Sequence, residues 1–210
     1  MSDTINVFNR GTVNCHRNRA AENFRDHDFL ISETGERLCD RLDDVNRQFP
    51  IALDLGCRTG GLSRIIGKRG GIKKMIQCDI SKAMCDHADK LVVVSDEEFI
   101  PFAPKSFDLV ISNLTLHWVN DLPGCLTQIR QTLKKDSLFL ASMLGGETLK
   151  ELRQSLSKAE LTIKGASTQR ISPFADVKDA GNLLQRSGFS LPVADTETIT
   201  VSYPDPLKLM

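Results

Sequence analysis

The chain has 210 residues, of which 40% are hydrophobic and 26% are charged. This composition is typical of a globular protein and excludes a collagen, a coiled coil and a wholly disordered chain. At roughly 150 residues per domain, the length predicts one domain with additions rather than two full domains. The 27 basic residues balance the 27 acidic ones, so no basic excess indicates nucleic acid or an anionic membrane as a partner.

Cysteine usage and hydropathy predict the compartment of the protein. The N-terminus lacks the apolar core of a signal peptide. The longest uncharged apolar stretch, near residues 137–146, is shorter than the ~18 residues that a membrane span requires. No CxxC pair is present, so we expect reduced, mostly buried thiols at Cys15, Cys39, Cys57, Cys78, Cys85 and Cys125. These features predict a soluble, cytoplasmic protein without a membrane span.

Residues 1–48 are expected to form an N-terminal arm and helix. Residues 1–20 are polar and basic, which favours a loosely held arm. Apolar residues at helical spacing across residues 28–46 predict an amphipathic helix, which ends before Pro50. The main domain is therefore expected to cover residues 49–210.

Short apolar runs alternate with helical segments from Ile51 onward. Strands are predicted at 51–55, 75–79, 91–94, 107–112 and 138–143, and helices at 62–67, 81–88 and 121–133. Further helices are predicted at 147–160 and 176–187, and a strand-like run at 190–203. This alternation predicts an α/β fold with a doubly wound, mostly parallel sheet and helices on both faces.

Acidic residues lie at the ends of the first three predicted strands. They are Asp54, Asp79 and Asp96, and the first is followed by a glycine-bearing turn that reaches Gly61. Ligands of open α/β sheets bind outside the carboxyl ends of the strands. Asp79 is placed to accept hydrogen bonds from both hydroxyls of a ribose, and Asp96 from an adenine amino group. The pattern predicts a nucleoside site.

The same region carries no pattern for phosphate groups. Neither GxxxxGK[ST] nor GxGxxG occurs. A nucleoside without a pyrophosphate is therefore predicted, which favours S-adenosyl-L-methionine over a dinucleotide.

With these motifs, the chain resembles the class I S-adenosylmethionine-dependent methyltransferases. More narrowly it resembles the malonyl-acyl-carrier-protein O-methyltransferases of biotin synthesis, and more closely still the mitochondrial methyltransferase-like factors of respiratory complex I assembly. The likeness runs along nearly the whole chain. Its segments are NVFNR (6–10), ALDLGC (52–57), DEEFIPF (96–102), SFDLV (106–110), LHWVNDLP (116–123), GGETLKELR (145–153), ISPF (171–174) and GF (188–189).

The resemblance implies a role for individual residues at the cofactor. The first turn and its acid would lie under the methionine end, the next strand ends would hold the ribose and adenine, and the end of the fourth strand would face the sulfonium. The implied cofactor-binding residues are Asp54, Gly56, Arg58, Gly60, Asp79, Ile80, Asp96, Glu97 and Asn113.

The acceptor side of the predicted site is less sharply defined. His117 is the candidate base for a phenol, amine or guanidinium acceptor, or else only a local hydrogen-bonding group. Trp118 is expected in the wall of the substrate pocket or in the core. Arg10 and Arg17 would suit a carboxylate-bearing substrate or an acidic carrier protein, with solvated charge as the default interpretation.

The chain departs from the family pattern at two places. The family has glycine at the position of Arg58, where an arginine places positive charge beside a sulfonium. Arg58 would weaken cofactor binding, or swing out and pair with Asp79 or with the methionine carboxylate. The family also closes its sheet with an antiparallel strand, and the chain ends before such a strand is reached, so its C-terminal end is expected to be truncated.

Three functions follow as hypotheses from the resemblance. The first is methyl transfer from S-adenosylmethionine, with the carboxyl group of a malonyl thioester on acyl carrier protein as the implied acceptor. The second is respiratory complex I assembly through binding of a partner subunit, for which the resemblance also implies arginine hydroxylation. The third is a degenerate relative without activity. No metal-ligand spacing of histidines and cysteines is found.

Overall fold

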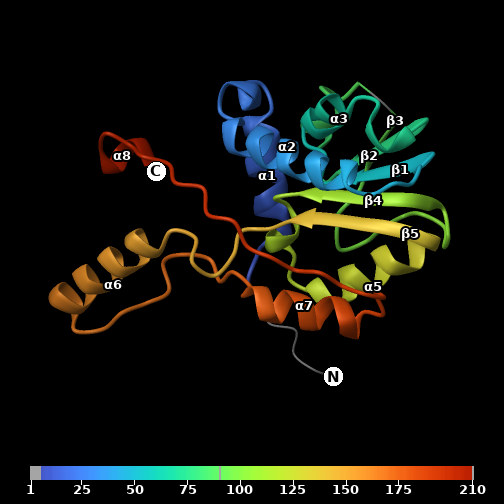
Figure 1. Ribbon diagram of the computed structural model, residues 1–210. Helices are drawn as coiled ribbons and strands as arrows, with labels where there is room; N and C mark the ends of the chain where they lie inside the picture. Colours follow the sequence, from blue (N-terminus) through green and yellow to red (C-terminus); the bar gives the residue numbers. More distant parts are fainter. Residues whose placement is uncertain (1–5, 90, 210) are drawn as a thin grey trace.

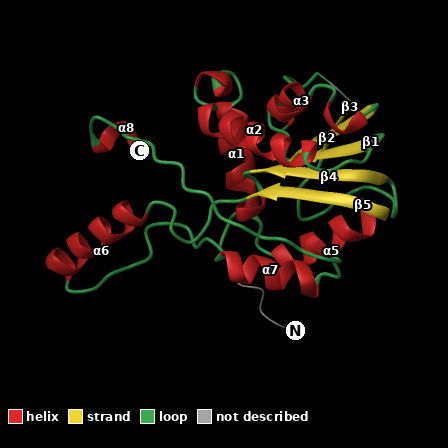
Figure 2. Cartoon of the chain, viewed as in Figure 1, coloured by secondary structure: helices red, strands yellow, loops and turns green. Residues whose placement is uncertain are grey.

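A computed structural model describes residues 6–89 and 91–209, and shows a five-stranded parallel sheet in the order β3-β2-β1-β4-β5 (Figures 1 and 2). The strands are β1 (Ile51–Leu55), β2 (Lys74–Asp79), β3 (Leu91–Val94), β4 (Phe107–Asn113) and β5 (Leu133–Ser142). The expected α/β fold with a parallel sheet is confirmed. The chain runs outward from β1 to β3 and then returns to β4 on the other side of β1. The strand order thus reverses between β1 and β4, which makes this a topological switch point. The space between the loops that follow these two strands is here termed the crevice.

Helices cover both faces of this sheet, as expected (Figure 1). On one face α2 and α3 pack through Leu38, Leu42 and Ile66, and on the other α5 packs through Leu126 and Ile129. The helices are α1 (Arg10–Ala20), α2 (Phe29–Asp43), α3 (Gly61–Ile66), α4 (Lys82–Cys85), α5 (Leu122–Thr132), α6 (Lys150–Lys164), α7 (Val177–Arg186) and α8 (Pro206–Leu209). Short 3-10 turns cover Phe24–Asp26, Arg69–Gly71 and Leu116–Trp118.

Local side chains set where several helices begin. Ser81 Oγ accepts from the Met84 N–H at 3.1 Å, which confirms the expected start of α4. Asp121 Oδ1 accepts from the Gly124 N–H at 2.9 Å at the start of α5. The helix predicted at 147–160 begins only at Lys150, because Leu149 has a left-handed φ of 55° that no α-helix continues through.

Two predictions for the ends of the chain are wrong. The strand-like run at 190–203 forms no strand, and Leu191 is 93% exposed. Alternating apolar residues alone do not make a strand, because a strand requires a neighbour for its backbone hydrogen bonds. The expected N-terminal arm contains the ordered helix α1, whose start is capped by Asn9 through the Thr12 N–H at 3.0 Å. The first five residues of that arm lie outside the described part.

Candidate cofactor site

The loops after β1 and β4 touch directly at the switch point. Gly56 follows β1 with a φ of 79°, and a Cβ atom built on it would lie 2.3 Å from the Thr115 side chain. Only glycine fits this close approach. Gly60, with a φ of 76°, is the N-cap residue before α3, and a Cβ there would lie 2.8 Å from Gln77 Nε2. The two glycines hold the turn after β1 against the strand ends.

Asp79 ends β2 and is completely buried. Its Oδ1 accepts from the Ser81 N–H at 2.8 Å. Its Oδ2 accepts from Arg17 Nη1 at 3.1 Å and from the Arg58 N–H at 3.0 Å. Both oxygens of the carboxylate predicted to bind ribose are therefore already engaged by protein donors.

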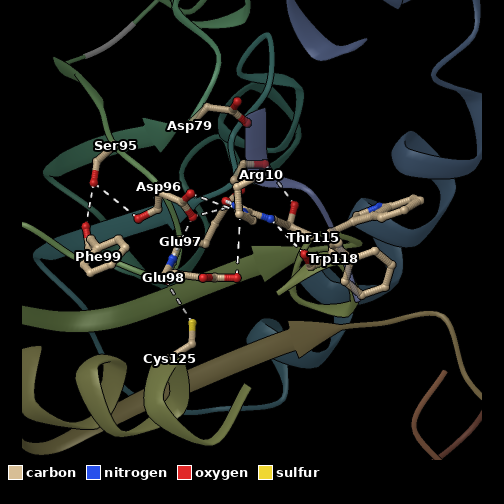
Figure 3. Close-up of polar contacts among 12 residues, drawn as sticks. Arg10, Asp79, Ser95, Asp96, Glu97, Glu98, Phe99, Thr115, Trp118 and Cys125 are labelled. Carbon is tan, nitrogen blue, oxygen red and sulfur yellow. Dashed lines mark hydrogen bonds and ion pairs between the residues drawn. The ribbon is translucent and has the colours of Figure 1, made fainter. Parts of the chain in front are cut away.

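Helix α1 supplies two arginines, Arg10 and Arg17, to the acidic residues at the ends of β2 and β3. Figure 3 shows Arg10 beside Asp96 and Glu97. Arg10 Nε donates to Asp96 Oδ2 at 3.0 Å, and Arg10 Nη2 also contacts Glu97. Arg17 Nη1 donates to Glu97 Oε1 at 2.7 Å. The two arginine side chains are only 14% and 11% exposed. The default interpretation of these arginines as solvated charge is therefore wrong.

The electrostatics of this cluster follow from burial and charge pairing. Burial alone lowers the pKa of Arg17, but the carboxylates of Asp79 and Glu97 more than offset this and raise the pKa above its ordinary value. The Arg17 Nη2 atom is buried and has no hydrogen-bond partner within the described part of the chain. The cluster thus pairs two arginines with three carboxylates and retains one unused donor.

Arg58 lies in the crevice itself. Its Nη1 donates to the carbonyl oxygen of Asn113 at 2.8 Å, and its Nη2 donates to the carbonyl of Leu114. Burial and the nearby charge of Arg17 lower the pKa of Arg58 to about 10. The guanidinium does not pair with Asp79: only the backbone N–H of Arg58 reaches that carboxylate, and the guanidinium lies inside the crevice.

Asp54 is buried within β1 rather than presented to solvent. Its closest polar side-chain contact is Gln77 Nε2, 3.5 Å from Oδ2. Burial raises the pKa of Asp54 to about 7, whereas the contact with Gln77 and the charge of Arg58 lower it in part. Asp54 is thus partly protonated near neutral pH.

The side chain of Asn113 at the end of β4 joins three elements. Its Oδ1 accepts from Thr34 Oγ1 at 2.9 Å and from Ser142 Oγ at 2.7 Å, and its Nδ2 donates to the Ile31 carbonyl at 2.7 Å. The amide fastens α2 to β4 and β5. The part of Asn113 that faces the crevice is its backbone carbonyl.

His117 and Trp118 form an aromatic cluster with residues distant in sequence. The His117 ring lies 5.5 Å from Trp118 and 5.9 Å from Phe174, and Trp118 lies 5.3 Å from Phe8, between ring centroids. Burial, together with the charges of Arg58 and Arg17, lowers the pKa of His117 to about 3. Its buried Nδ1 has no hydrogen-bond partner among residues 6–89 and 91–209. The imidazole is neutral and a weak base.

The structure brings most predicted site residues to one edge of the sheet, with Ile80 half-buried directly after Asp79. Sequence reasoning missed the direct pairing of Arg10 and Arg17 with the acids and the contact of Phe174 with His117. The segments that carry these residues were recognised, but no spacing rule relates an arginine of α1 to an acid 62 to 87 positions away. No group of side chains that would hold a metal ion was found among the described residues.

A methyltransferase domain model matches residues 53–141. The mitochondrial arginine-hydroxylase NDUFAF5 of Homo sapiens is 43% identical over 99% of this chain, which spans 62% of that protein's length. A malonyl-[acyl-carrier protein] O-methyltransferase of Methylovorus sp. (strain MP688) is 34% identical over 97% of this chain and 72% of its own length. A possible histamine N-methyltransferase from Thermotoga maritima shares the fold, with a TM-score of 0.60 at 19% identity over 83% of this chain and 81% of its own. The chain belongs to the class I S-adenosylmethionine-dependent methyltransferase family.

This fold and domain imply binding of S-adenosylmethionine, and the described residues fit it with two exceptions. The acids stand at the strand ends, and buried donors or acceptors of Arg17, Thr59 and His117 are without partners among the described residues. One exception is that the carboxylates of Asp79 and Asp96 already accept from protein donors. The other is the guanidinium of Arg58, which donates to the carbonyl groups of Asn113 and Leu114. The structure tests one part of the compartment prediction. Among the described residues, no helix is long and apolar enough to cross a membrane. The family's first relatives are named as mitochondrial, which does not fit a plainly cytoplasmic protein.

Proposed function

We propose that the protein transfers the methyl group of S-adenosylmethionine to a carboxylate. The observation that carries the proposal is the burial of His117, which lowers its pKa to about 3 and removes the predicted base for a protonated acceptor. Phenol, amine and guanidinium acceptors must lose a proton during methylation, whereas a carboxylate is already a nucleophile. The chemistry available therefore favours a carboxylate acceptor.

The cofactor, when bound, supplies an electrophilic methyl group on a sulfonium. The protein's contribution is to hold the acceptor in line with that methyl group, which by itself accounts for a large share of such rate enhancements. Asp79 and Asp96 would hold the adenosine end after Arg17 and Arg10 release them. The cluster of buried His117 with half-buried Trp118 and Phe174 would limit the access of water to the reacting atoms.

A cavity of about 430 Å³ supports an anionic acceptor. Arg153 of α6 lines it and donates to the Gly146 and Thr148 carbonyls at 3.0 and 3.1 Å. It forms no ion pair with a carboxylate among the described residues, so its charge is free to attract an anion. Phe174 lines the same cavity and contacts His117, which connects the cavity to the crevice. The malonyl thioester of acyl carrier protein is the acceptor that we propose.

Mass spectrometry of malonyl-acyl carrier protein after incubation with the purified chain and S-adenosylmethionine tests this function. We expect a methyl ester, and a several-fold slower reaction for Arg153→Gln than for Lys158→Gln on the same helix. A folded chain that binds the cofactor and forms no ester on this carrier would contradict the proposal.

The second candidate is a role in complex I assembly through a partner subunit. Two observations favour it: the 43% identity to a mitochondrial arginine-hydroxylase, and an arginine that fills the cofactor crevice. This role predicts that the chain co-purifies with a complex I subunit from cells that lack the endogenous relative. Loss of that association at physiological salt would exclude it.

A further inference from the structure

We propose that the guanidinium of Arg58 is an internal occupant of the crevice and that S-adenosylmethionine binds only when this side chain leaves it. The inference rests on the proposed function, because it concerns the cofactor of that reaction. In this proposal Arg58 sets the affinity of the site for the cofactor. It also sets the preference between the positively charged sulfonium of S-adenosylmethionine and the neutral thioether of its product.

The Arg58 side chain lies at the switch point of the sheet. Its backbone follows β1, yet its two terminal nitrogens donate to the carbonyls of Asn113, the last residue of β4, and of Leu114, the next residue. The side chain therefore bridges the two strands between which the topology switches, where ligands of open α/β sheets bind. It is 9% exposed, so it fills this space rather than covering it from outside.

The carbonyl groups that bind Arg58 suit the cofactor equally well. Two carbonyl oxygens aimed into one crevice form a site for a cation with several N–H donors. The guanidinium meets that requirement, and so would the ammonium of the cofactor's methionine end. Both cannot occupy these carbonyls together. In addition, Arg58 and Arg17 would both repel the positive sulfonium, and this repulsion does not act on a neutral thioether.

The backbone supplies an independent observation. Arg58 has a φ of 49°, in the left-handed region that disfavours residues with a Cβ atom. Such a conformation persists only where surrounding contacts hold it, here the carbonyls and the bond from its N–H to Asp79. Lys105 shares this feature, with a φ of 57°, but it is exposed and lies outside the crevice. It therefore offers a matched control for both the charge and the backbone strain.

Calorimetric titration separates these effects. S-adenosylmethionine and its neutral thioether product, S-adenosylhomocysteine, are each titrated into the wild type, Arg58→Gly and Lys105→Gly. We expect Arg58→Gly to bind both at least tenfold more tightly, with the larger gain for S-adenosylmethionine, and Lys105→Gly to match the wild type. Arg58→Gln, which keeps the side-chain length and removes the charge, should give an intermediate gain and replaces the glycine variant if that one does not fold.

Each other outcome overturns the inference in a distinct way. Wild-type binding as tight as that of Arg58→Gly would show that the guanidinium does not compete, and would leave the proposed function intact. An equal gain in Lys105→Gly would assign the effect to backbone strain. No binding by any folded variant would overturn both this inference and the proposed function. Tight binding by Arg58→Gly without methylation of the carrier would retain the inference and contradict the function alone.

Discussion

Asp54→Asn should change how the stability of this protein depends on pH. Burial raises the pKa of Asp54 to about 7 in the folded protein, from an ordinary value of 3.8. The difference between these two values corresponds to about 4 kcal/mol. Between pH 4 and 7 the unfolded chain releases this proton while the folded protein keeps it, so the free energy of unfolding falls as pH rises. Above pH 7 both states are ionised and this loss is complete.

Asparagine at this position cannot ionise, and its amide can donate to Gln77. The Gln77 Oε1 atom is buried without a hydrogen-bond partner among the described residues. The free energy of unfolding of the variant should therefore equal or exceed that of the wild type at pH 8. Between pH 4 and 8 the variant should not show the decrease in this free energy that Asp54 causes in the wild type.

Urea unfolding followed by circular dichroism at several pH values measures this effect. The wild-type free energy of unfolding, relative to that of Asp54→Asn, should fall by about 4 kcal/mol from pH 4 to pH 8. Asp40→Asn, on the exposed surface of α2, controls for loss of a carboxylate and should stay within about 0.5 kcal/mol of the wild type. Parallel curves for wild type and Asp54→Asn, or a difference that grows in the opposite direction, would refute the reasoning.

Three further changes test the site and the core. Arg17→Gln should cost about 3–5 kcal/mol in urea unfolding, because it leaves buried carboxylates such as Asp79 without their cation. Arg37→Gln, whose ion pair lies on the surface, should leave the unfolding curve close to that of the wild type. The NMR ring signals of His117 should show no inflection between pH 5 and 8, because its pKa in the folded protein is about 3. The unfolded chain binds a proton at this histidine near its ordinary pKa of 6.5, so His117 should lower the free energy of unfolding as the pH falls below that value. Leu53→Ala, at a completely buried position of β1, should cost about 2–5 kcal/mol in the same unfolding assay.

Each of these predictions has a result that would contradict it. A loss below 1 kcal/mol for Arg17→Gln would mean that the carboxylates are solvated or protonated rather than paired. An inflection of His117 above pH 5 would show that water reaches the imidazole, and would reopen its role as a general base. A loss for Leu53→Ala as small as that of an exposed leucine would place β1 outside the core.

Much of the fold was predictable because its physical causes are local. Parallel strands covered on both faces require nearly continuous apolar residues, so runs such as Ile51–Leu55 and Phe107–Asn113 were visible in the sequence. An acid at a strand end is also a local feature, so the sequence was enough to predict Asp79 as a site residue. Residues 190–203 have the composition of a strand, but whether a partner strand lies beside them is not a local property.

The sequence by itself determined the order of strands and helices, the family and the residues that meet at the carboxyl edge of the sheet. Only the tertiary structure decided what those residues contact. The approach of α1 pairs Arg17 with Asp79, 62 positions away, and the turn after β1 directs Arg58 onto the carbonyl of Asn113, 55 positions away. Charge neutralisation and burial depend on such distant contacts, and they set the pKa values of Asp54 and His117. The sequence therefore determines which residues can form the site, whereas the charge state and the hydrogen-bond partner of each residue arise only when distant segments pack together.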